Sequence, residues 1–118
     1  MIIGKQLEME KILRKAQAYY KNEIAGTITE TGDGYIFQYD KDFLKKNIPI
    51  SISLPLREEP YRSKELFGFF KGLLPEGWYL NIVSATQKVD SKDDFGVLLS
   101  TTSTDTIGAV TVRKIEID

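Results

Sequence analysis

Residues 66–78 read Leu-Phe-Gly-Phe-Phe-Lys-Gly-Leu-Leu-Pro-Glu-Gly-Trp, a stretch in which large apolar residues are interrupted by three glycines and a proline. Glycine lowers helix stability and proline removes a backbone donor, so one continuous core helix is disfavoured. The pattern predicts a short aromatic helix over about 64–71, a turn, and a second helix over about 76–87 that begins near Pro75. We interpret the stretch as a rigid corner that carries Trp78.

Length and composition limit the class of protein. The chain has 118 residues, 42% of them apolar, which indicates one folded domain. It has no cysteine and no histidine, which excludes disulfides, thiolate or histidine metal sites and any Ser-His couple. A formal net charge of -1 speaks against direct binding of nucleic acid. No apolar run approaches the ~20 residues of a membrane span, and no export signal is visible, so a cytoplasmic location is expected.

The first fifteen residues differ in pattern from the rest. Leu7, Ile12 and Leu13 fall near helical spacing, and Glu10 lies four residues before Arg14. This spacing predicts a helix over about 5–15. We interpret residues 1–15 as a helical extension, either packed loosely on the domain or used to dock a partner, and residues 16–118 as the module itself.

From residue 16 the apolar period changes to two, which predicts strands. A hairpin is expected over 19–29, with Ile24 and Ile28 on one face. The turn sequence at 31–34 then leads into a strand over 35–39 that places three aromatic residues on one face. Residues 48–56 also alternate, but two prolines confine that segment to a sheet edge or an irregular crossing.

The remaining predicted elements follow from capping signals. Asp40 is expected to cap a helical turn that extends through Leu44, and Ser63 the aromatic helix. Residues 91–94 resemble the start of a helix through Leu99, followed by a loop over 100–106 and a strand over 107–117. Together these elements predict an α+β fold, a small and mainly antiparallel sheet with three or four packed helices.

Chemical motifs in the chain are better explained structurally. Asp94-Phe95-Gly96 copies the magnesium-binding triplet of protein kinases, but the glycine-rich loop, strand lysine and catalytic loop of a kinase are missing before it. We interpret Asp93 and Asp94 as acids at a helix N-terminus. No catalytic, cofactor-binding or metal-binding residue is predicted. Trp78 remains open between an interface role and a core role.

Four stretches resemble the N-terminal subdomain of HipA-type toxin kinases, in order and spacing, over about residues 17–113. They are Tyr-Ile-Phe-Gln-Tyr-Asp at 35–40, Ile-Ser-Ile-Ser-Leu-Pro-Leu at 50–56, Phe-Lys-Gly-Leu-Leu-Pro-Glu-Gly at 70–77 and Gly-Ala-Val at 108–110. In that family the module lies beside the kinase domain of a serine/threonine kinase toxin. The kinase core would begin near Asp118, so the chain is similar to the free-standing version, the HipS-like antitoxin of three-part systems.

The resemblance implies a non-enzymatic antitoxin that binds and inhibits a separately encoded HipA-like (HipT-like) kinase. The alternative is a structural subunit that completes the kinase fold without inhibiting it. A HipB-like helix-turn-helix protein is a further candidate partner. The corner is expected to enter or border the active cleft of the kinase, through the following partner-binding residues: Phe70, Leu73, Leu74, Pro75, Glu76, Gly77 and Trp78.

Overall fold

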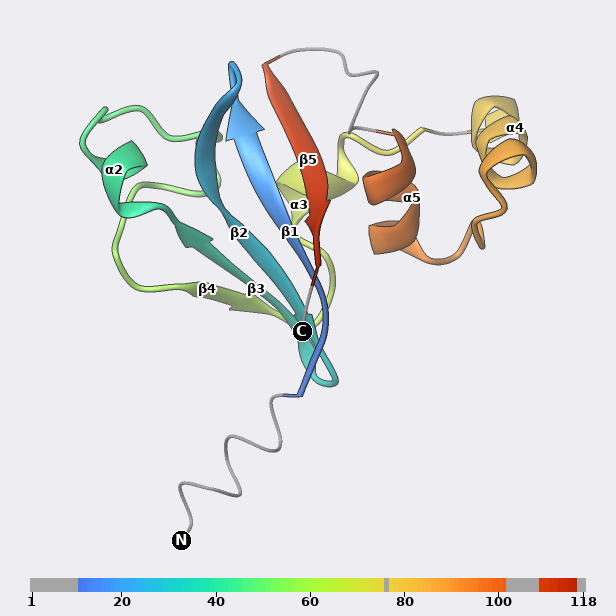
Figure 1. Ribbon diagram of the computed structural model, residues 1–118, viewed down its shortest axis with the longest axis horizontal. Coiled ribbons are helices and arrows are strands. Elements are labelled where there is room, and N and C mark those ends of the chain that lie inside the picture. Colours follow the sequence, from blue (N-terminus) through green and yellow to red (C-terminus); the bar gives the residue numbers. More distant parts are fainter. Residues whose placement is uncertain (1–10, 76, 102–108, 117–118) are drawn as a thin grey trace, which may run out of the picture.

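A computed structural model describes residues 11–75, 77–101 and 109–116, and for residues 77–79 and 83 it describes the backbone alone. Five antiparallel strands form one sheet in the order β4-β3-β2-β1-β5. In chain order the elements are β1 (Ile12–Tyr20), β2 (Glu23–Thr31), β3 (Gly34–Tyr39), α2 (Lys41–Leu44), β4 (Tyr61–Ser63), α3 (Gly68–Lys71), α4 (Gly77–Gln87), α5 (Asp94–Thr101) and β5 (Val110–Ile115). The predicted α+β class is confirmed (Figure 1).

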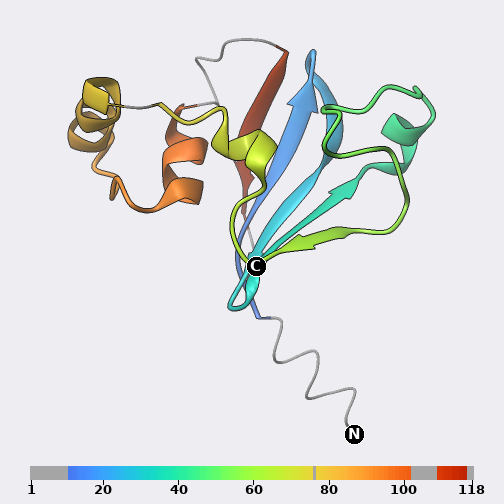
Figure 2. The ribbon, with the colours of Figure 1, turned by 180° about the vertical axis from the view of Figure 1, so that it is seen from behind.

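The helices are distributed unevenly around the sheet. Helix α3 lies over one face of the sheet, behind the strands in Figure 1 and in front of them in Figure 2. Helix α5 lies beside β5, and α4 stands beyond α5, on the side away from the sheet. No helix of the described residues is long and apolar enough to cross a bilayer.

The predicted hairpin forms between β1 and β2. Its two turn residues, Lys21 and Asn22, have φ of 50° and 70°, the left-handed conformation that matches the twist of paired strands. The register moves from Ala18↔Gly26 to Tyr19↔Ile24, which leaves Ala25 as an extra residue in a β-bulge. The bulge turns Ile24 outward, 40% exposed. The predicted common face of Ile24 with the buried Ile28 is therefore wrong.

The helix predicted over 5–15 is also wrong in the part that the structure describes. Strand β1 begins at Ile12 and pairs with β2 on one side and with β5 on the other. Pairing with β2 from Ile12 onward, and with β5 from Lys15 onward, outweighs the weak helical spacing of this segment, since tertiary context routinely overrides local propensity. Residues 1–10, where the rest of that helix was expected, lie outside the described residues.

The segment 48–56 crosses the sheet edge without forming a strand, as its prolines predicted. Ile50 and Leu54 are buried, whereas Ile52 between them is 94% exposed. A turn closes this segment, with the Leu54 N–H donating to the Ser51 carbonyl at 3.0 Å. The buried hydroxyl of Tyr39 accepts from the Ile50 N–H at 3.2 Å and donates to the Leu54 carbonyl. The alternating apolar residues of this segment therefore do not share one buried face.

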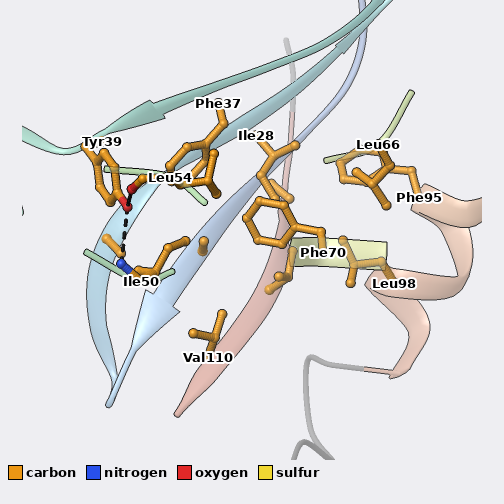
Figure 3. Packing of buried hydrophobic residues seen from close by; sticks show 14 of the residues in the cluster. Ile28, Phe37, Tyr39, Ile50, Leu54, Leu66, Phe70, Phe95, Leu98 and Val110 are labelled. Atoms are coloured by element: carbon orange, nitrogen blue, oxygen red, sulfur yellow. Dashed lines mark hydrogen bonds between the residues drawn. The ribbon is translucent and has the colours of Figure 1, made fainter. Parts of the chain in front are cut away.

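The core lies between the sheet and α3 and α5, around Phe37 (Figure 3). The ring centroid of Phe37 lies 4.9 Å from that of Tyr39 and 5.6 Å from that of Phe70. Phe95 and Leu98 of α5 are fully buried in the same cluster. Packing of this kind attaches α3 and α5 to the strands.

The other predicted helices form, with boundaries that differ from the prediction by a few residues. Asp40 caps α2, its carboxylate accepting from the Asp42 N–H at 3.1 Å. Helices α4 and α5 and strand β5 lie where the sequence placed them, within the described residues. Helix α3 is shorter than predicted, because Ser63 belongs to β4 and Phe67 occupies the N-cap without a side-chain hydrogen bond. Residues 102–108, which hold most of the predicted loop, lie outside the described residues.

Candidate partner-binding corner

The corner comprises residues 66–78, and its first half is firmly attached to the core. Leu66 is 4% exposed and Phe70 is fully buried. The backbone stays hydrogen-bonded past the end of α3, because the Leu73 N–H donates to the Phe70 carbonyl and the Leu74 N–H to the Lys71 carbonyl, each at 3.1 Å. The segment after α3 is therefore a hydrogen-bonded turn.

The structure places the predicted partner-binding residues in three different environments. Phe70 is a core residue of the free chain: its ring packs on Phe37 and is not presented at the surface, and its contact with a partner stays a prediction. Leu73, Leu74 and Pro75 are half-buried, and the two leucines pack against the core cluster. Glu76 lies outside the described residues. The backbone of Gly77 and Trp78 forms the first turn of α4, but the side chain of Trp78 is not among the described parts.

Helix α4 continues the corner as an apolar element far from the sheet. It runs over Gly77–Gln87 with the sequence Gly-Trp-Tyr-Leu-Asn-Ile-Val-Ser-Ala-Thr-Gln and contacts α5. Ile82, in the middle of the helix, is 45% exposed. The helix carries no charged residue at all. A helix with apolar residues on most sides is normally covered by other protein.

A cluster that the sequence did not reveal attaches the other end of this region to the sheet. Arg14 of β1 donates to both carboxylate oxygens of Glu30 on β2, at 2.6 and 3.0 Å. The same guanidinium donates to both oxygens of Asp93, just before α5, at 2.9 and 2.8 Å. Its central carbon lies 5.2 Å from the centre of the Phe95 ring. We call Arg14, Glu30 and Asp93 the Arg14 clasp.

The clasp explains the triplet at 94–96. Asp93 also caps α5, accepting from the Gly96 N–H at 3.1 Å, as the sequence predicted for an acid at this position. A Cβ atom on Gly96 would lie 2.3 Å from Oδ2 of Asp93. Phe95 serves the core, and Gly96 leaves room for the carboxylate. Among the described residues, no group of three or more acids could hold a metal ion.

Arg14 and Asp93 stabilise each other in their charged forms. The hydrogen bonds from Arg14 hold the pKa of the Asp93 carboxyl below its usual value, against a smaller opposing effect of burial. Glu30 and then Asp93 raise the pKa of Arg14, which is protonated at every accessible pH. The sequence analysis placed Arg14 in a helix beside Glu10. Its pairing with Asp93 could not be predicted from local spacing, because the two residues lie 79 positions apart.

Comparison with known proteins agrees with this architecture. The family of HipA N-terminal domains matches residues 16–113. An uncharacterized protein of Haemophilus influenzae is 31% identical over 106 residues, which are 90% of this chain and 97% of the relative. A putative kinase of Sinorhizobium fredii, Y4mE, is 33% identical over 89 residues, which are 73% of this chain and 21% of the kinase. The solved N-terminal domain of HipA toxin superimposes with a TM-score of 0.71 at 28% identity, covering 93% of this chain and 100% of that domain.

Proposed function

Because the chain belongs to the family of HipA N-terminal domains, we propose that it is a non-enzymatic antitoxin that binds a separately encoded HipA-type serine/threonine kinase and inhibits it. The family match supports a kinase as the partner, and the absence of histidine and cysteine leaves few groups for chemistry of its own. A HipB-like helix-turn-helix protein is proposed as a further partner. With a net charge of -1, this chain would depend on such a partner to reach DNA.

Two relatives support binding in trans. In the Haemophilus influenzae relative the matched region is 97% of the protein, whereas in the putative kinase of Sinorhizobium fredii it is 21%. The same module therefore occurs both as nearly a whole protein and as a minor part of a longer chain. A module of this kind is able to reproduce between two chains an interface that a longer chain makes within itself.

The single observation that carries the proposal is the placement of the corner and α4. The turn after α3 is held by Phe70, and α4 extends from it away from the sheet with Ile82 exposed (Figures 1 and 2). A tryptophan on such an element buries ~150–250 Å² in a partner pocket and loses little conformational freedom on docking. We assign Trp78 this role, with Glu76 accepting hydrogen bonds from basic groups of the kinase.

Blocking of the active cleft is the mechanism that we propose. The corner would enter or border the cleft of the kinase and obstruct the nucleotide or the protein substrate. The second candidate function, a subunit that completes the kinase fold, is favoured by the single-chain arrangement in the Sinorhizobium fredii relative. These two functions predict opposite effects on kinase activity.

A titration separates the two functions. The HipA-type kinase of the same genome, purified alone, is assayed for autophosphorylation and for phosphorylation of a protein substrate while this chain is added. Inhibition that is complete near one equivalent is the expected result. A rise in activity over the same range would favour the structural subunit. No change in activity, with no complex on size-exclusion chromatography, would overturn both.

A further inference from the structure

We infer that Arg14 is a positioning residue, which holds α4 and α5 in one orientation on the sheet and thereby presents the corner to its partner. We call residues 77–101, from the start of α4 to the end of α5, the arm. The anchoring of the arm is a property of this chain alone. Its consequence for a kinase rests on the proposed function.

The chain is anchored in the body of the protein both before and after α4. Before α4, the corner is attached through Phe70, which is fully buried against Phe37. After α4, the chain returns to the body at Asp93, where the Arg14 clasp begins. Helix α4 lies between these two points, on the far side of α5 from the sheet (Figures 1 and 2). Fixing both points fixes the direction of the helix that carries Trp78.

Apolar packing alone does not define that direction. Phe95 and Leu98 bury α5 in the core, but hydrophobic burial is non-directional and tolerates small rotations. The guanidinium of Arg14 is a rigid planar fork, and here it engages two carboxylates at once, with four hydrogen bonds between 2.6 and 3.0 Å. Paired bonds of this kind define angles as well as distances. The clasp therefore sets the orientation of α5 relative to β1 and β2.

Gly96 supplies a second, independent observation. A Cβ atom at this position would lie 2.3 Å from Oδ2 of Asp93 and 3.3 Å from the guanidinium of Arg14. Glycine is a weaker helix former than alanine. The first turn of α5 thus contains glycine at position 96, where any side chain would push the carboxylate of Asp93 away from Arg14.

Hydrogen exchange on the free protein tests the anchor. Arg14→Met removes all four hydrogen bonds while keeping an apolar stem, and Arg14→Lys keeps the charge but not the fork. The matched control is Arg113→Met, since Arg113 stacks on Tyr19 at 4.5 Å and contributes a cation elsewhere on the sheet. We expect both Arg14 variants to lose about tenfold protection in α5 and in residues 88–93, with β2 and β3 unchanged. The control should leave the arm unchanged.

A second variant keeps the test decisive if Arg14→Met does not fold. Asp93→Asn leaves the Arg14–Glu30 pair intact and breaks the clasp only on the side of α5. The same selective loss of protection in the arm is expected. Equal loss in the arm and in the sheet would mean that Arg14 contributes only general stability, and unchanged protection of the arm would mean that it anchors nothing; either result overturns the inference.

Binding to the kinase provides the functional readout. The dissociation constant of the complex should rise about tenfold for Arg14→Lys and stay constant for Arg113→Met, because a mobile arm must be ordered before it docks. Selective loosening of the arm with unchanged affinity would overturn the positioning role. If the wild-type chain binds no kinase, the proposed function fails, whereas the exchange data still decide whether Arg14 anchors the arm.

Discussion

Arg14 and Asp93 lie 79 residues apart in the chain, and the guanidinium of Arg14 donates two hydrogen bonds, of 2.9 and 2.8 Å, to the carboxylate of Asp93. This contact joins β1 to the residue that directly precedes α5. Because Glu30 engages the same guanidinium, three elements meet at one cation. Under the positioning role that we infer for Arg14, the geometry of the candidate partner-binding region depends on residues outside that region.

Stability at low pH should report on the clasp. The pKa of Asp93 in the folded protein lies below its ordinary value of 3.8, chiefly because Arg14 donates to it. A lowered pKa gives stability that is present above the ordinary pKa and is lost as the pH falls through the folded value. Wild type should exceed Asp93→Asn by about 1 kcal/mol in free energy of unfolding at pH 7, a modest difference because Asp93 is partly exposed.

Urea denaturation at a series of pH values measures this difference. The difference should shrink as the pH falls below about 4 and should vanish once Asp93 is protonated. Asp42→Asn is the matched control, since the side chain of Asp42 is 89% exposed and pairs with the exposed Lys45 at 3.6 Å. A difference between wild type and Asp93→Asn that persists unchanged to pH 2 would contradict the assignment.

Gly96→Ala should destabilise the protein although alanine is the better helix former. The added Cβ atom would lie 2.3 Å from Oδ2 of Asp93, so the carboxylate must move and its bonds to Arg14 must lengthen. We expect a loss of about 1–2 kcal/mol in the free energy of unfolding. Gly68→Ala in α3 is the control, because nothing lies within 4 Å of its Cβ position. Equal effects of the two substitutions on thermal unfolding would refute this explanation.

Tyr39→Phe should lower the free energy of unfolding, because it removes the side chain that holds the crossing segment at 48–56. The buried hydroxyl of Tyr39 serves both the Ile50 N–H and the Leu54 carbonyl, so its removal leaves two backbone groups without this partner. Such a loss costs about 1–3 kcal/mol. Tyr61→Phe is the matched control, since its hydroxyl donates to the Pro55 carbonyl at the surface. Chemical denaturation of the two variants should show a clearly larger effect for Tyr39, and the reverse order would contradict the role given to its hydroxyl.

Local sequence signals predicted most of the elements. The period-two pattern around Phe37, the turn residues at 31–34 and the cap at Asp40 each act within a few residues, and each of these elements forms as expected. Pro49 and Pro55 correctly predicted an irregular crossing. The corner was also placed correctly, because Pro75 and the glycines around it constrain the backbone directly.

The errors arose where distant contacts decide the structure. Ile12 and Arg14 belong to a strand because they pair with Thr31 and Glu30 of β2, and no local spacing records these partners. The bulge at Ala25 reverses the face of Ile24 through the register of two strands. Burial of Phe70 follows from the packing of α3 on Phe37, and its aromatic character alone does not distinguish a core residue from an interface residue.

The purified chain should not bind ATP by itself. Its sequence lacks a glycine-rich phosphate loop, and the described residues hold no acid cluster for a metal ion. Isothermal titration calorimetry should therefore give no measurable heat of binding with ATP and magnesium, whereas the HipA-type kinase serves as the positive control. An affinity in the micromolar range for the isolated chain would contradict the proposal that it is a non-enzymatic module.

Trp78→Ala tests the central claim most directly, when thermal unfolding and kinase inhibition are measured on the same preparation. The account predicts a protein that melts like wild type but inhibits the kinase about 30-fold more weakly, a loss of about 2 kcal/mol typical of an interface hot spot. Ile52→Ala, at an exposed apolar residue on the crossing segment, should inhibit like wild type. A folded Trp78→Ala protein that inhibits fully would contradict the account, and so would a loss of about 3–5 kcal/mol in the free energy of unfolding, the signature of a core residue.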